Sequence, residues 1–405
     1  MYLTRLSLTN WRNFARLDTD VPRGPILLVG ENAQGKTSFL EAVYFLATFA
    51  SFQAGSDREL VNFIAAREPL AVARLTADFE RREKSRTAGA HRLEVRLIQE
   101  ANGINGQSRL RKEILVDGLK KKVNEAIGLF NAVIFLPQTL RIIEGSPEER
   151  RRYLNLTLAQ VLPGYAATLN DYAQLLAQRN ALLKQVGEGE ADRGQLAFWD
   201  EHLSAAGACL IHARIQALRE LEGLAAQIHL QLTRGSEVLR LDYLPAFDPL
   251  PQPEKQFALP VGEPFDRSGL SEEKIRLGFL ESLVRLHAEE INRGMTTIGP
   301  HRDELRFLGN RVDLGTYGSR GQARTAILSM KLAEVEWMRK KTGQFPVVLL
   351  DEVLAELDVQ RRADLLDRMA KSEQTLLTTT DVDLFSAEFI EKSSLWRIQA
   401  GRIAG

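Results

Sequence analysis

Residues 30 to 37 read Gly30-Glu31-Asn32-Ala33-Gln34-Gly35-Lys36-Thr37. An apolar run at 25–29 precedes them, and apolar residues recur at helical spacing over 38–46. Strand, glycine loop and helix in this order are the context of a P-loop, whose backbone N–H groups and helix N-terminus bind phosphate. Lys36 would reach the β- and γ-phosphates, and Thr37 would hold Mg²⁺ through its hydroxyl. The sequence therefore predicts a nucleotide-binding protein.

The composition limits the class of protein. The chain has 405 residues, enough for two domains or for one domain with a large insertion. Lys plus Arg and Asp plus Glu each number 53, so no net charge draws the molecule as a whole to DNA. The one cysteine excludes an intramolecular disulfide and cysteine-rich zinc modules. Because no apolar run approaches the ~20 residues of a membrane span and no signal-peptide core is found, we expect a cytoplasmic protein.

A second set of candidate site residues lies near the C-terminus. The apolar run 345–350 ends in Asp351 and Glu352. At the end of a strand, Asp351 could hold Mg²⁺ through water, and Glu352 could orient or deprotonate an attacking water. The glycine turn 318–322 precedes a helical pattern, so Ser319 could donate to a phosphate there. The turn alone is a weak signal, but chance production of all three elements in this order is very improbable.

Basic residues gather in a region that is predicted to be an antiparallel sheet, because apolar and polar residues alternate over 73–116. Charge runs usually form solvated faces, but in a neutral chain they are the best candidates for contacts with a DNA backbone. These candidates are Arg81, Arg82, Lys84, Arg109, Arg111, Lys112, Lys120, Lys121 and Lys122.

Two further polar residues, Arg12 and Asn13, fit either an exposed hairpin or a contact with nucleotide phosphates.

The middle of the chain is predicted to be helical. Apolar residues at helical spacing over 161–186 and 199–228 indicate an antiparallel pair joined by 187–194. Ser146 and Ser271 are predicted N-caps of two further helices. A proline-rich loop occupies 245–264. We expect a discontinuous head of residues 1–150 and 296–405 and an inserted helical lobe of residues 151–295.

Together, these elements resemble the ABC-type ATPase heads, in which a Leu-Asp pair like Leu357-Asp358 follows the Asp-Glu strand end. The long stretch with helices between Lys36 and Ser319 resembles the chromosome-maintenance and repair branch. Within that branch the chain resembles the RecF family of bacterial replication and recombination-repair proteins. The further stretches that carry this resemblance are 11–14, 57–61, 145–154, 178–184, 299–303, 321–325 and 351–358.

The resemblance implies an α/β fold, a P-loop ABC-type ATPase head of mixed sheets and flanking helices with an inserted helical arm. It implies a weak DNA-dependent ATPase that uses ATP and Mg²⁺ and dimerises when ATP binds. The homodimer would clamp duplex DNA near single-strand gaps and, with RecR and RecO, help load RecA. The expected roles are recombinational repair, replication-fork maintenance and the SOS response to DNA damage.

The resemblance also implies roles for single residues. Glu352, Lys36 and Asp351 would be catalytic, and Mg²⁺ would be held by Thr37, by Asp351 through water and by Gln138. Two residues, Asp358 and Thr380, would belong to the dimer seam, which is the interface between the two subunits, and to the nucleotide-dependent switch. The second subunit would contribute Ser319, Arg320, Gly321 and Gln322. ATP would contact Arg12, Asn13, Gly30, Glu31, Asn32, Ala33, Gln34, Gly35, Lys36, Thr37, Ser38 and Gln138.

Some residues depart from the family's pattern. Gln138 and Thr139 stand where acidic residues are usual, Gln53 replaces a basic residue, and the loop at 245–264 is longer than usual. The competing hypothesis is an ABC-head ATPase of a nuclease or defence system, but such proteins append a metal-dependent nuclease, and this chain ends soon after Thr380.

Overall fold

The computed structural model describes residues 1–82, 88–101, 108–248 and 266–404. Its contacts divide the chain into two compact units, Met1–Thr139 with Glu334–Gly405, and Leu140–Ala333. The sequence predicts domain boundaries between residues 150 and 151 and between residues 295 and 296, and these boundaries remain a prediction. Residues 296–333 fall in the second unit because the strand at 304–309 pairs there with the strand at 239–244.

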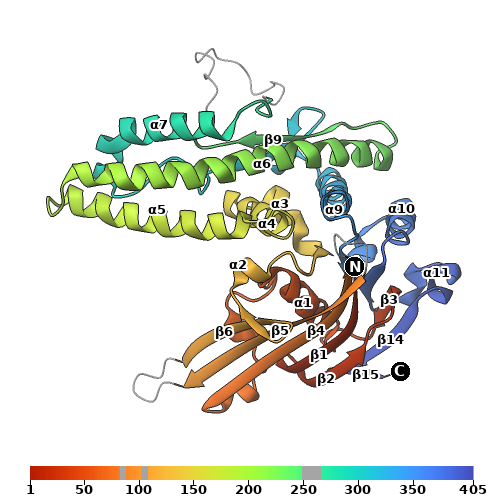
Figure 1. Cartoon of the computed structure of the whole chain (residues 1–405). Helices are drawn as coiled ribbons and strands as arrows, with labels where there is room; N and C mark the ends of the chain where they lie inside the picture. Colours follow the sequence, from red (N-terminus) through yellow and green to blue (C-terminus); the bar gives the residue numbers. More distant parts are fainter. Residues whose placement is uncertain (83–87, 102–107, 249–265, 405) are drawn as a thin grey trace. The chain divides into compact units, whose positions relative to one another are not determined.

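The first unit contains an antiparallel sheet of six strands (Figure 1). The predicted sheet over 73–116 is confirmed, and two N-terminal strands extend it. Its buried face carries the alternate apolar residues, such as Leu75 and Val95, which are fully buried. In order across the sheet the strands are β2 (Phe14–Asp20), β1 (Tyr2–Trp11), β4 (Leu70–Arg82), β5 (Ala88–Ala101), β6 (Ser108–Val116) and β7 (Leu119–Lys121).

The second sheet of this unit is mainly parallel. In order its strands are β15 (Arg402–Ala404), β14 (Ser394–Gln399), β3 (Gly24–Val29), β13 (Gln374–Thr379), β12 (Val347–Asp351) and β8 (Ala132–Phe135). All run parallel except β15 at the edge. Parallel strands end at the same edge of a sheet, and ligand sites form there in such folds. The segments that follow β3, β12, β13 and β8 therefore share one edge.

The helix that follows the P-loop, α1 (Lys36–Thr48), packs against strands of both sheets (Figure 1). Its residues Phe39, Leu40, Val43 and Phe45 are fully buried in one core with residues of both sheets. A helix covered on two sides needs apolar residues around most of its surface, which explains why its sequence lacks a clear polar face. The first unit also contains α2 (Val123–Ala126), α10 (Val359–Met369) and α11 (Ala387–Glu391).

The second unit is mainly helical, as the sequence predicts. Its long helices are α5 (Tyr165–Gly187), α6 (Leu196–Leu232) and α7 (Glu272–Arg293), and α7 packs against both members of the predicted pair. The predicted caps are confirmed, since Ser146 Oγ accepts from Glu149 N and Ser271 Oγ from Lys274 N. The remaining elements are α3 (Arg141–Glu144), α4 (Pro147–Ala159), α8 (Leu314–Tyr317), the first part of α9 (Arg320–Thr342) and the sheet β11 (Val312–Asp313), β10 (Glu304–Gly309) and β9 (Leu239–Leu244).

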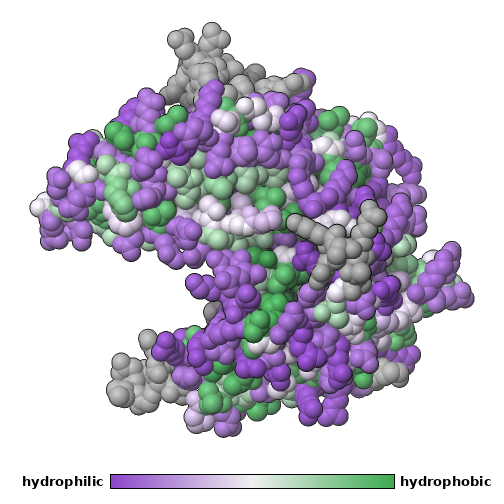
Figure 2. Space-filling view, in the orientation of Figure 1, coloured by the Kyte–Doolittle hydropathy of each residue, from purple (hydrophilic) through white to green (hydrophobic). Residues whose placement is uncertain are grey.

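A buried ionic cluster joins the three long helices. Arg179 of α5 lies 2.7 Å from Asp200 of α6 and 2.6 Å from Glu290 of α7, and all three side chains are fully buried. Removing one partner of such a cluster leaves a buried charge uncompensated, so these residues fix how the helices pack. Figure 2 shows mainly hydrophilic residues over this unit's visible helical surface, with scattered hydrophobic groups. No helix in the described ranges is long and apolar enough to cross a membrane.

Candidate functional site

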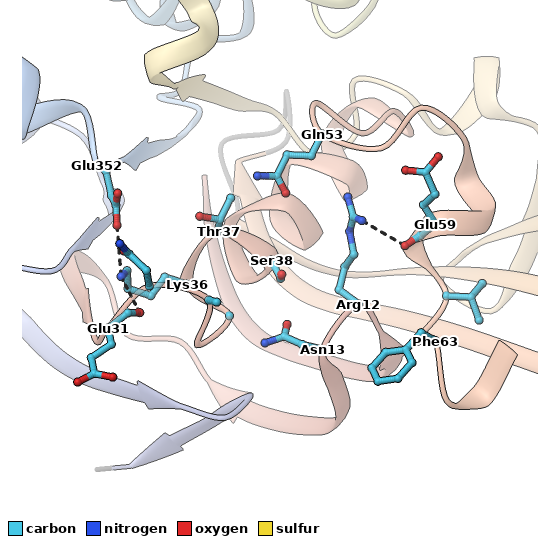
Figure 3. A pocket seen from close by; sticks show the side chains of 14 residues that line it. Arg12, Asn13, Glu31, Lys36, Thr37, Ser38, Gln53, Glu59, Phe63 and Glu352 are labelled. Atoms are coloured by element: carbon cyan, nitrogen blue, oxygen red, sulfur yellow. Dashed lines mark hydrogen bonds and ion pairs between the residues drawn. The ribbon is translucent and has the colours of Figure 1, made fainter. Parts of the chain in front are cut away.

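A cavity of about 510 Å³ lies over the P-loop, entirely within the first unit (Figure 3). The β1–β2 turn, the P-loop with the start of α1, the segment 53–63 and the residue after β12 form its walls. The lining residues are Arg12, Asn13, Glu31, Asn32, Ala33, Gly35, Lys36, Thr37, Ser38, Gln53, Glu59, Val61, Phe63 and Glu352.

Two P-loop positions have room only for glycine. Gly35 has a φ of 114°, and a Cβ there would stand 2.6 Å from Asn13 Nδ2. A Cβ on Gly30 would stand 2.4 Å from the carbonyl oxygen of Ile398. The loop is therefore wedged between the β1–β2 turn and β14. Its curled backbone and the N-terminus of α1 form a cradle that suits a phosphate group.

Lys36 lies at the centre of this cradle. Its Nζ donates to the carbonyl oxygens of Gly30, at 2.7 Å, and Glu31, at 3.0 Å. It also lies 3.3 Å from the Glu352 carboxylate (Figure 3). The lysine is only 4 % exposed, so the amine is held in the cavity wall by these three partners.

A hydroxyl and a carboxylate meet beside the lysine. Thr37 Oγ1 donates to both carboxylate oxygens of Asp351, at 2.9 and 3.0 Å, and Thr378 Oγ1 donates to Oδ1 at 2.7 Å. Burial raises the pKa of the Asp351 carboxyl above 3.8, although the two hydroxyl donors favour its charged form. Hard oxygen ligands of this kind suit Mg²⁺ bound together with a phosphate. The residues present therefore fit the predicted metal.

Glu352 has an unusual backbone conformation. Its φ is 51°, in the left-handed region that is uncommon for residues other than glycine. The N–H group donates to Thr378 Oγ1 at 3.0 Å, and the side chain, 40 % exposed, reaches Lys36. Outliers of this type cluster at functional sites, because the surrounding structure must hold them in place.

The structure places Arg12 both in a hairpin turn and in the cavity wall. Its φ is 51°, and its Nε and Nη2 donate to the fully buried Glu41 carboxylate at 2.7 and 2.8 Å. Nη1 donates to the Glu59 carbonyl oxygen at 3.2 Å. Ser51 also donates to Glu41, so one buried carboxylate orients this side of the cavity. Glu41 was not among the predicted site residues, although a carboxylate within a mainly apolar helix was an available signal.

Several residues that were predicted to contact ATP or to lie at the dimer seam and switch are not among the lining residues. Gln34 Oε1 accepts from Ala400 N at 2.7 Å, so this side chain fastens the P-loop to the β14–β15 turn. Gln138 follows β8, which β12 and β13 separate from β3, while exposed Thr380 follows β13. Asp358 caps α10 by accepting from Arg361 N at 2.9 Å. None of these four residues lines the cavity, and their roles remain predictions.

The predicted second-subunit residues lie at the start of α9, in the second unit. Ser319 Oγ accepts from Gln322 N at 3.2 Å, and Gln322 Oε1 accepts from Ser319 N at 3.0 Å. This reciprocal pair is a capping box, which satisfies two helix-end donors. Gln322 Nε2 also donates to Glu237 at 2.9 Å, while Arg320 and Gly321 are exposed.

The candidate DNA-binding residues separate into two groups. Arg81 donates to the carbonyl oxygens of Gly128 and Leu129, and Lys112 pairs with Asp57 at 2.7 Å, so both have structural partners. The exposed candidates are Arg82, Arg109, Arg111, Lys120, Lys121 and Lys122. Among these, Arg111 and Lys120 both pair with Glu113. Lys84, like most of the proline-rich loop, lies outside the described residues.

Comparisons with known proteins agree over nearly the whole chain. The family model of the RecF/RecN/SMC N-terminal domain matches residues 2–398. The DNA replication and repair protein RecF of Roseiflexus castenholzii is 39% identical over 415 residues, which cover 100% of this chain and 99% of that protein. The RecF protein of Bacillus subtilis is 34% identical over 412 residues, with 100% of each chain covered.

Solved structures give the same result. A structure of the recombination mediator protein RecF with ATP, in the RecFOR pathway, matches with a TM-score of 0.81 and 29% identity. The match covers 100% of this chain and 97% of the other. An SMC head bound to the C-winged helix domain of ScpA matches with a TM-score of 0.51 and 14% identity, which shows likeness of fold alone.

Proposed function

Because this chain belongs to the RecF family of DNA replication and repair proteins, we propose that it binds ATP in the P-loop cavity and uses ATP hydrolysis to control its hold on DNA. The observation that supports this most directly is the hydrogen bond between Thr37 and Asp351, which joins residues 314 positions apart beside Lys36. The full-length match to RecF proteins favours the repair function over the nuclease or defence alternative.

The side chains in the cavity have complementary tasks. Thr37 and Asp351 would hold Mg²⁺, which when bound would offset the negative charge of the phosphates. Lys36 would exchange the carbonyl oxygens of Gly30 and Glu31 for phosphate oxygens. That exchange would also release the Glu352 carboxylate from its 3.3 Å contact with the amine. Glu352 could then accept the proton of the water that attacks the γ-phosphate.

The second unit would complete the site of another copy of this chain. The start of α9 exposes Arg320 and Gly321, and Ser319 Oγ can turn from its capping bond to a phosphate. In the resulting homodimer Asp358 and Thr380 would lie at the seam, and Gln138 would respond to the nucleotide. We propose that this dimer clamps duplex DNA near gaps and helps load RecA with RecR and RecO. Hydrolysis would be slow and DNA-dependent, and would reopen the dimer.

The anisotropy of a labelled gapped duplex tests this clamp. ATP with Mg²⁺ is expected to tighten DNA binding by the native chain roughly tenfold or more, a typical coupling between two sites. In Ser319→Arg the bulky side chain would block the partner's phosphates, so ATP should have no effect. An added arginine alone strengthens DNA binding through its charge. The matched control is therefore Gln227→Arg, which changes an exposed residue of helix α6 and should keep the ATP response. If ATP changed nothing in the native chain, the clamp would be wrong although the cavity could still bind ATP.

A separate prediction follows from the burial of the Asp351 carboxyl group. Since its pKa is raised above 3.8, the folded chain keeps this proton at pH values where the unfolded chain has lost it. Between 3.8 and the raised pKa the folded state binds more protons, so this group makes the free energy of unfolding fall as pH rises. At pH 7 the nucleotide-free Asp351→Asn variant should therefore melt at a higher temperature than the native chain.

Thermal unfolding followed by circular dichroism at several pH values would measure this difference. The difference in melting temperature between Asp351→Asn and the native chain should become smaller as the pH is lowered towards 3.8. Asp351→Asn should also lose the extra stabilisation that Mg²⁺ gives to the nucleotide complex. Asp367→Asn changes an exposed carboxylate on α10 and is the matched control, with no shift expected. A lower melting temperature for Asp351→Asn at pH 7 would contradict the prediction.

A further inference from the structure

The P-loop cavity has an apolar side as well as a polar one. Lys36, Thr37 and Glu352 line the polar side. Val61 and Phe63 are its largest apolar lining residues, and Figure 3 shows Phe63 across the cavity from Lys36 and Glu352. A nucleotide has the same division, because its phosphates are charged while its base is flat and largely apolar. The two sides therefore fit the two ends of one ligand.

Phe63 is much more exposed than an ordinary core aromatic. Its side chain is 67 % exposed, whereas Val61, two residues earlier, is 4 % exposed. The Arg67 guanidinium lies over the ring at 6.0 Å from its centroid. Most of the residue's surface is thus accessible to solvent at the wall of the cavity, although burying an aromatic ring is normally favourable.

The backbone around Phe63 is fixed relative to the P-loop. Asn62 Nδ2 donates to the Arg12 carbonyl oxygen at 2.6 Å, and Asn62 Oδ1 accepts from Ile64 N at 3.1 Å. Arg12 N in turn donates to the Leu60 carbonyl oxygen at 2.9 Å. The same turn contains Asn13, whose amide abuts Gly35 of the P-loop. A ring attached to this hydrogen-bonded segment is held at a set place beside the phosphate cradle.

We propose that Phe63 is the platform on which the base of the bound nucleotide stacks, while the P-loop holds the phosphates. This inference rests on the proposed ATP site and assigns a specificity-determining residue to it. Stacking on an aromatic ring is tolerant of base identity, because every base has a π-face. Phe63 would therefore select base-bearing nucleotides over inorganic polyphosphates, and would distinguish only weakly between one base and another.

The alternative use of the exposed ring is in an apolar surface patch. Ile64 and Leu70, which are 63 % and 60 % exposed, belong to the same stretch of chain, and the three side chains could meet a protein partner. Ile64 does not line the cavity, whereas Phe63 does. A nucleotide-binding experiment that compares these two neighbours separates stacking from a general apolar patch.

Isothermal titration of the full chain with ADP and with pyrophosphate, each with Mg²⁺, tests the proposal, because ADP avoids hydrolysis. The native chain should bind ADP more tightly than pyrophosphate. Phe63→Ala should weaken ADP binding roughly 5- to 100-fold and leave pyrophosphate binding unchanged. Phe63→Trp should keep or strengthen ADP binding, because it preserves an aromatic face. Ile64→Ala, the matched control, should bind both ligands as the native chain does.

The other outcomes would overturn the inference. Native ADP affinity in Phe63→Ala, or an equal loss in Ile64→Ala, would show that the base does not stack on this ring. An equal loss of ADP and pyrophosphate would show that the substitution damaged the P-loop instead. Lys36→Ala serves as the reference for the cavity itself and should lose both ligands. If Lys36→Ala loses both while Phe63→Ala loses neither, the ATP site stands and only the base platform fails.

Discussion

Replacing Lys36 by alanine is expected to weaken ATP binding by at least about a hundredfold. Its ammonium group would make charge-assisted hydrogen bonds with two phosphates, and each such bond contributes about 1.5–3 kcal/mol. The amine already lies in the cavity, within 3.0 Å of two P-loop carbonyl oxygens. It can therefore transfer to phosphate oxygens without a change of backbone. Calorimetric titration with ATP and Mg²⁺ would measure the loss.

The controls for this variant address folding and charge. Lys392→Ala removes an exposed lysine that pairs with Glu388 outside the cavity, and it should bind ATP normally. The melting temperature of nucleotide-free Lys36→Ala shows whether its fold is intact, since the substitution leaves two loop carbonyl oxygens without their donor. A folded Lys36→Ala variant with native ATP affinity would remove the P-loop assignment.

The phosphate side of the site could be predicted because its signals are local. The P-loop and the strand that ends in Asp351 are each short, contiguous patterns with a strict order of residue types. Parallel pairing of β3, β13 and β12 then brings the two patterns to the same edge of one sheet. The sequence assigned Thr37 and Asp351 to the same Mg²⁺, and the structure brings the two side chains within hydrogen-bond distance. Their metal-binding roles remain predictions.

The base side of the cavity could not be predicted in this way. Phe63 lies in a 3-10-containing segment with no periodic pattern. Hydrogen bonds between this segment and the β1–β2 turn, such as that of Asn62 to Arg12, bring it to the P-loop. The role of Glu41 depends on the same long-range packing, because its partner Arg12 lies 29 residues away. Contacts between loops do not follow a regular spacing of residues along the chain. The residues that make such contacts therefore cannot be recognised from a sequence pattern.

Charge runs were the least informative signal. Lys112 and Arg81 belong to basic runs in the sequence, yet the first pairs with Asp57 and the second donates to two carbonyl oxygens. Whether a basic residue on a strand faces solvent or a neighbouring loop depends on register and on long-range packing. The same holds for the buried Arg179. Nothing in the sequence indicated that its guanidinium would pair with two carboxylates where three helices meet.

Glu352→Gln is expected to preserve ATP binding while reducing hydrolysis by at least a hundredfold, a usual loss when a general base is removed. Glutamine has the same shape and tolerates the φ of 51° no worse than glutamate, so the local fold should persist. The substitution also removes the negative charge 3.3 Å from the Lys36 amine, which should favour phosphate binding. Phosphate release and calorimetric titration would measure turnover and affinity separately.

The same variant should accumulate as an ATP-bound dimer, because closure would no longer be followed by hydrolysis. Sedimentation velocity with ATP should then show a dimer that the native chain would form only transiently, and Ser319→Arg added to Glu352→Gln should abolish this dimer. Glu388→Gln, which alters an exposed carboxylate on α11, should behave as the native chain does. Hydrolysis at the native rate in Glu352→Gln would mean that another group takes the proton. Loss of turnover without accumulation of a dimer would mean that Glu352 takes part in hydrolysis but that ATP binding does not hold two heads together. That result would contradict the proposed clamp.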